Sequence, residues 1–196
     1  MSLESEIVVV SGLPRSGTSL MMQMLDSGGI RAITDEIRTS DTDNPRGYFE
    51  FEPVKKTKED SSWLSGARGK VVKMVSSLLY DLPATETYRV IFMERDIDEV
   101  LASQAKMLAR LNRPSAPAES MKAAFQIHLE RLFKWLPQQS NVRYLVVNYN
   151  RLIADPTFEM DAISTFLDGR VCIDALKAAI DTSLYRNRSS QQNAPA

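Results

Sequence analysis

Four short apolar runs divide the chain, and each has the length and the β-branched content of a buried strand. They cover residues 6–11, 69–75, 88–93 and 142–147. Short continuous apolar runs bounded by polar or turn residues are typical of strands buried on both faces. The hydrophobic pattern therefore predicts a sheet of about four to five strands, most of them parallel.

The segments between these runs carry apolar residues at helical spacing. One stripe lies within residues 20–25 and stops at Gly28-Gly29, which is typical of a helix C-terminus. Two further stripes lie within 100–111 and 121–136. Strands that alternate with helices indicate βαβ units. We therefore predict an α/β fold, a three-layer sandwich with helices on both faces of a parallel central sheet.

Composition narrows the class of protein. The chain has 196 residues, of which 43% are apolar, and this suits one domain with a sizeable core. Twenty-four basic and 25 acidic residues give a formal net charge of −1, so neither nucleic acid nor a membrane is an expected partner. We place the single domain at residues 1–188 and expect a flexible tail at 189–196.

Cysteine content and hydropathy bear on location. The single Cys172 excludes a disulfide framework and is expected to be a packing residue beside Val171. No apolar run approaches the roughly 18 residues that a membrane-spanning helix needs. The first six residues are polar and acidic, unlike the basic start of a signal peptide. The expected location is cytoplasmic.

The most informative stretch is VVVSGLPRSGTSL, residues 8–20. A strand leads through a loop bounded by Gly12 and Gly17 directly into a helix, which is the arrangement that binds phosphate through backbone N–H groups. The G-x4-G spacing is that of a P-loop, but Thr18 stands where a P-loop has Lys. Arg15 can supply the missing positive charge, and Thr18 and Ser19 can donate hydroxyls. The predicted sandwich is therefore of the P-loop type.

A P-loop kinase of a small molecule is one interpretation of this loop. Such an enzyme needs a metal-binding carboxylate at a strand end, and Glu94 or Asp96 could serve after the third strand. The absence of Lys after Gly17 argues against it. A catalytically inactive nucleotide-binding module is a second alternative.

Two motifs resemble those of the sulfotransferases, which use 3′-phosphoadenosine 5′-phosphosulfate and no metal. The run PRSGTS after Gly12 resembles their 5′-phosphosulfate loop, and Arg95 with Ser103 eight residues later resembles their 3′-phosphate motif. A planar guanidinium suits a phosphate because it binds two oxygens at once. The nucleotide-binding residues that the resemblance implies in these motifs are Gly12, Pro14, Arg15, Ser16, Gly17, Thr18, Ser19, Arg95 and Ser103.

The resemblance extends more loosely to three other positions. Lys73 falls where the family has a strand-end Lys near the bridging oxygen of the donor. Tyr149, in VNYNRLIADP, resembles a Tyr that lies near the adenine. Arg186, in LYRNR, resembles a reduced form of a C-terminal contact to the 3′-phosphate.

The catalytic base is the point at which the chain departs from the cytosolic small-molecule sulfotransferases. Those enzymes have a His two residues after the strand Lys, and this chain has Val75 there. An extended segment at 31–34 leads into Glu36 and Arg38, which project to one face if that conformation continues. The arrangement resembles the tyrosylprotein sulfotransferases, in which a catalytic Glu and an Arg follow the loop at the same spacing.

We therefore predict Glu36 as the general base, with Glu50 as the second candidate and the single His128 as the third. A surface ion pair between Glu36 and Arg38 is the ordinary alternative. The irregular segment 41–53 is expected to be a lid or a wall of the acceptor site, or else a simple connector.

The function predicted from these residues is transfer of a sulfuryl group from 3′-phosphoadenosine 5′-phosphosulfate to a hydroxyl or amine. The acceptor is a small molecule or a peptide that the sequence does not identify. Arg15 and Lys73 are expected to offset the negative charge on the sulfuryl and bridging oxygens.

Overall fold

The computed structural model describes residues 3–35, 37 and 47–181. Its centre is a sheet of four parallel strands in the order β2-β1-β3-β4. The strands are β1 (Ile7–Gly12), β2 (Val71–Val75), β3 (Tyr88–Glu94) and β4 (Val142–Asn148). All four coincide with the apolar runs of the sequence, and the predicted α/β fold with a parallel sheet is confirmed.

Side chains alternate between two cores on opposite faces of the sheet. In β1, Val8 and Val10 belong to one core and Ile7 and Val9 to the other, and all four are fully buried. Helices cover both of these faces.

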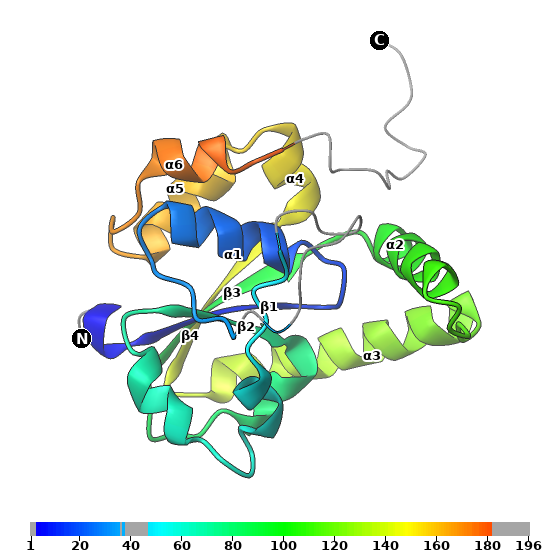
Figure 1. Ribbon diagram of the computed structural model, residues 1–196, viewed down its shortest axis with the longest axis horizontal. Coiled ribbons are helices and arrows are strands. Elements are labelled where there is room, and N and C mark those ends of the chain that lie inside the picture. The colour runs from blue at the N-terminus through cyan, green and yellow to red at the C-terminus, as the bar shows by residue number, and fades with distance from the viewer. Residues whose placement is uncertain (1–2, 36, 38–46, 182–196) are drawn as a thin grey trace.

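The α-helices are α1 (Thr18–Ser27), α2 (Ile97–Arg110), α3 (Ala118–Trp135), α4 (Tyr149–Ala154), α5 (Thr157–Phe166) and α6 (Ile173–Ala178). Figure 1 shows α1, α4, α5 and α6 covering the face with Val8 and Val10, and α3 crossing the face with Ile7 and Val9. Short 3₁₀ helices are η1 (Leu3–Ser5), η2 (Glu52–Lys56), η3 (Ser62–Ala67), η4 (Ser76–Asp81) and η5 (Leu136–Gln138).

The extended segment predicted after α1 does not become a fifth strand of the sheet. It forms one parallel bridge, between Ala32 and Val71 of β2, rather than a ladder. Pairing stops because the backbone N–H of Asp35 donates to the carbonyl of Glu50, 3.1 Å away, instead of continuing along β2. The Asp35 carboxylate accepts the Glu52 N–H, and this hydrogen bond lowers the pKa of Asp35. The chain therefore leaves the sheet at this point.

One smaller prediction is also wrong. Cys172 was expected to pack in the core, but it is exposed because it is the residue that precedes α6. Its neighbour Val171 provides the packing and is 7% exposed.

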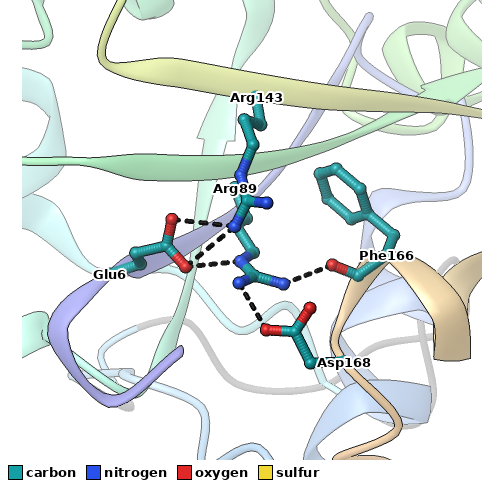
Figure 2. Close-up of polar contacts among 5 residues, drawn as sticks. All are labelled: Glu6, Arg89, Arg143, Phe166 and Asp168. Carbon is teal, nitrogen blue, oxygen red and sulfur yellow. Dashed lines mark hydrogen bonds and ion pairs between the residues drawn. The ribbon is translucent and has the colours of Figure 1, made fainter. Parts of the chain in front are cut away.

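A buried ion cluster fixes the amino ends of three strands, as Figure 2 shows. Arg89, on β3 and 1% exposed, donates to Glu6 at 2.6 Å and to Asp168 at 2.5 Å. Its third contact is the carbonyl of Phe166 at the end of α5, and Arg143 of β4 donates to both oxygens of Glu6. Buried charges are tolerated when they are paired in this way. The cluster occupies the edge of the sheet opposite the loop that follows β1.

Candidate functional site

The loop between β1 and α1 lies at the carboxyl edge of the sheet, where open α/β sheets bind ligands. Gly17 has a φ of 100° and is the N-cap of α1. A Cβ atom there would lie 2.3 Å from Cδ2 of Tyr149, and one at Gly12 would lie 2.7 Å from the carbonyl oxygen of Met93. Both glycines are therefore required by close packing, as the G-x4-G spacing predicts.

The groups inside this loop fit a phosphate. No side chain caps the N-terminus of α1, so its first N–H groups and the positive end of the helix dipole face the loop. The hydroxyl of Ser16 is buried and has no hydrogen-bond partner among the residues that the structure describes. A buried donor without a partner is costly, and a bound anion would satisfy it.

Arg95 lies beside this loop because of the strand register. Gly12 of β1 is opposite Met93 of β3, so Arg95, two residues later, lies next to the phosphate loop. Its Nη1 donates to the carbonyl of Arg15 at 3.1 Å, and its guanidinium stacks 4.5 Å from the centre of the Tyr149 ring. The predicted 3′-phosphate arginine is thus in contact with the 5′-phosphosulfate loop.

Ser103 is joined to the loop as well. It is 4% exposed on α2, and its Oγ accepts a hydrogen bond from Nε of Arg15 at 3.1 Å. The backbone of Arg15 is left-handed, with a φ of 72°. We expected Arg15 and Ser103 to bind opposite ends of a nucleotide, but in the structure the Arg15 side chain crosses to the 3′-phosphate motif.

Lys73 is held against the irregular segment for which the sequence leaves a lid, an acceptor-site wall or a simple connector open. On β2, its Nζ donates to the carbonyl of Tyr48 and lies 3.9 Å from Oε1 of Glu50. The Tyr48 ring is 5.8 Å from the same ammonium. Glu50, the second candidate base, is therefore an ion-pair partner of the predicted catalytic lysine.

His128 reaches the end of β2 from α3. Its Nε2 and the Oγ of Ser76 are 2.8 Å apart, and Ser76 directly follows Val75. Burial lowers the pKa of His128, so the imidazole is neutral at pH 7 and able to accept a proton. Val75, which occupies the family's histidine position, is 42% exposed.

The comparison with protein families decides the identity. A profile of the sulfotransferase domain matches residues 5–194. The chain belongs to the sulfotransferase family. No curated protein sequence matches it.

Solved structures agree with this sulfotransferase fold. The sulfotransferase domain from the curacin biosynthetic pathway aligns with a TM-score of 0.52 and 14% identity, over 94% of this chain and 92% of that one. Sulfotransferase STF1 from Mycobacterium tuberculosis H37Rv aligns with a TM-score of 0.56 and 14% identity, over 96% of this chain and 73% of that one. At such identities the likeness concerns the fold.

The structure brings most of the predicted site residues together. Arg15, Gly17, Arg95 and Ser103, together with Tyr149, form one connected group through the contacts above, and Gly12 begins the loop that carries two of them. Pro14 and Ser16 lie in the loop, and Thr18 and Ser19 begin α1. Glu36, Arg38 and Arg186 lie outside the described residues.

Two residues in contact with this candidate site were missed by sequence reasoning. Glu99 pairs with Arg95, and its spacing of four residues is a known signal for helical ion pairs. Ser76 pairs with His128, but these residues are 52 positions apart and no sequence signal connects them.

Among the described residues, no group of His, Cys, Asp and Glu side chains could hold a metal ion. In the same part of the chain, no helix combines the length and the apolar character needed to cross a membrane.

Proposed function

We propose that this sulfotransferase transfers the sulfuryl group of 3′-phosphoadenosine 5′-phosphosulfate to a hydroxyl or amine. The observation that carries the proposal is the contact between the two anion-binding motifs. Arg95 donates to the Arg15 carbonyl and Arg15 donates to Ser103, so one ligand with two anionic groups can engage both motifs. A nucleotide phosphorylated at both the 3′ and the 5′ position has this property.

The phosphate loop would hold the 5′ end of the nucleotide. The N–H groups at the start of α1 and the buried Ser16 hydroxyl would donate to its oxygens. Arg95 and Ser103 would bind the 3′-phosphate, and the Tyr149 ring that supports Arg95 lies against Gly17, next to the expected position of the nucleoside. Burial raises the pKa of the Tyr149 phenol, which therefore stays protonated at neutral pH.

Arg15 and Lys73 would offset the charge that develops during transfer. The bound donor supplies the sulfuryl group: an acceptor oxygen or nitrogen forms a bond to sulfur while the bond from sulfur to the 5′-phosphate oxygen breaks. Lys73, in the middle of the edge strand β2, is held by its contacts with Tyr48 and Glu50, and Arg15 would turn from Ser103 toward the loop. Fixed positive groups at a site of developing negative charge lower the barrier in this way.

Glu36 remains our proposal for the base that takes the acceptor's proton. Its carboxylate belongs to the segment that follows the Ala32 bridge to β2, the strand that also carries Lys73. Glu50 and His128 are the two alternatives.

The acceptor would be a small molecule or a peptide, and a cytoplasmic location fits the net charge of −1 and the single cysteine.

Calorimetric titration with adenosine 3′,5′-bisphosphate, AMP and ATP tests the proposal. We expect the bisphosphate to bind at least about tenfold more tightly than AMP, because only it can make the charge-assisted contacts to Arg95 and Ser103. Arg95→Ala should abolish most of this preference and leave AMP binding nearly unchanged.

Arg110→Ala is the matched control, because it removes an equal charge from the exposed end of α2, the helix that begins two residues after Arg95. It should keep the preference. Equal affinity of the wild type for the bisphosphate and AMP would refute the donor assignment. Tighter binding of magnesium-ATP would instead favour a kinase, and nucleotide binding without turnover on a broad acceptor panel would favour an inactive module.

A further inference from the structure

Glu99 is an acidic residue in an unusual environment for the first turn of a helix. Its side chain is 1% exposed, whereas first-turn carboxylates that interact only with the helix dipole are usually in water. Its Oε2 accepts a hydrogen bond from Nε of Arg95 at 3.0 Å. Its own backbone N–H is bound by the Asp96 carboxylate, which caps α2. The position of the carboxylate is therefore set by the start of the helix.

The Arg95 guanidinium is fixed by three contacts that point in different directions. Nε is bound to Glu99, Nη1 is bound to the Arg15 carbonyl, and the face of the group rests 4.5 Å from the Tyr149 ring centre. Two in-plane hydrogen bonds and one stacking contact define both the plane and the rotation of a guanidinium. An arginine held in this way loses little further freedom when it binds a phosphate.

The charges around Arg95 also indicate that Glu99 holds this arginine in place. The Arg95 side chain is 7% exposed, and a guanidinium so buried is costly unless a nearby anion offsets its charge. The Glu99 carboxylate provides this anion at Arg95 and is buried, so water screens it little.

We propose that Glu99 is a positioning residue that presets Arg95 for a 3′-phosphate. The inference rests on the proposed function, since it assigns the selection of 3′-phosphorylated nucleotides to that site. Glu99 would not touch the nucleotide. Its effect would be on the ratio of affinities for adenosine 3′,5′-bisphosphate and AMP.

Glu99→Gln tests this role because it keeps the size of the side chain and removes its charge. The chain offers a matched control in Glu159, which is also 1% exposed and pairs with an arginine, Arg151, that belongs to neither anion-binding motif. Both variants are measured by calorimetry with the bisphosphate and AMP, and both are checked by thermal unfolding. We expect the preference for the bisphosphate to fall from about tenfold to about threefold or less in Glu99→Gln, with AMP affinity unchanged. Glu159→Gln should lose comparable stability and keep the full preference.

Glu99→Asp is the second variant, for the case in which Glu99→Gln does not fold. It keeps the charge and withdraws the carboxylate from Arg95 Nε by one methylene, so the preference should be intermediate. A full preference in either Glu99 variant would overturn the inference, and so would an equal loss of preference in Glu159→Gln. No preference in the wild type would refute the proposed function itself, whereas a wild-type preference that survives in the Glu99 variants refutes only the role of Glu99.

Discussion

Replacing Gly17 by Ala separates two effects that the phosphate loop combines, backbone strain and contact with Tyr149. Gly17 has a φ of 100°, and an added Cβ would lie 2.3 Å and 2.7 Å from two carbons of the Tyr149 ring. Gly29, at the other end of α1, has a φ of 106° and nothing within 4 Å of an added Cβ. Gly29→Ala therefore introduces the same kind of backbone strain without the contact.

The two positions allow the cost to be divided. A left-handed conformation costs a non-glycine residue about 1–2 kcal/mol, and this applies to both variants. In a chain of this size, that loss lowers the Tm by about 2–8 °C. At Gly17 the Tyr149 ring must also move by about 1 Å or more to restore an ordinary carbon–carbon contact. Overpacking of this kind lowers the stability by about a further 1–3 kcal/mol. We expect Gly17→Ala to lose roughly twice the stability of Gly29→Ala.

Function should separate the variants more sharply than stability does. Displacing the Tyr149 ring removes the support beneath Arg95, whose guanidinium rests 4.5 Å from the ring centre. Calorimetry should show that Gly17→Ala weakens binding of adenosine 3′,5′-bisphosphate by about tenfold or more, while Gly29→Ala stays within about twofold. The reasoning is refuted if the two variants have the same Tm and the same affinity.

Two further predictions concern titratable residues: one is about turnover and the other about the pH dependence of stability. Glu36→Gln should lower turnover by about 10²-fold with bisphosphate affinity intact, because it removes basicity and keeps hydrogen bonding; near-normal turnover would move the role of base to Glu50 or His128. Because burial lowers the pKa of His128 below its ordinary value of 6.5, the unfolded chain binds this proton more readily than the folded one. Thermal unfolding at a series of pH values should therefore show a loss of stability as the pH falls through about 6.5, and this loss should be smaller in His128→Gln; an identical profile in the variant would show that the imidazole does not carry it.

The strands and the phosphate loop could be predicted because their signals are local. Parallel strands covered on both faces read as continuous apolar runs, and the β1 run at Ile7–Gly12 is buried throughout. Gly12 and Gly17 are visible in sequence because no other residue fits where Met93 and Tyr149 approach the backbone. These features need no knowledge of distant partners.

The segment after α1 shows where local reasoning ends. Residues 31–34 have the extended character that the sequence indicates, and Ala32 does pair in parallel with β2. Whether such a segment becomes a strand depends on its competing partners. Here the backbone of Asp35 bonds to Glu50 and the Asp35 carboxylate to the N–H of Glu52, residues 15 and 17 positions away. The competition is decided by tertiary contacts that periodicity does not report.

The union of the two anion sites is the most consequential feature that sequence alone could not supply. The Arg15–Ser103 hydrogen bond joins residues 88 positions apart, and the Arg95–Arg15 bond joins residues 80 apart. Both follow from one fact of topology, the pairing of β1 with β3 that places Met93 opposite Gly12. Once this register is set, any residue two positions beyond Met93 lies beside the loop, so an arginine there serves both motifs. An additional strand between β1 and β3 would move Arg95 about 4.8 Å farther from the phosphate loop. The present hydrogen bonds could not span that distance. The sheet order is therefore what brings the two short motifs into contact with each other.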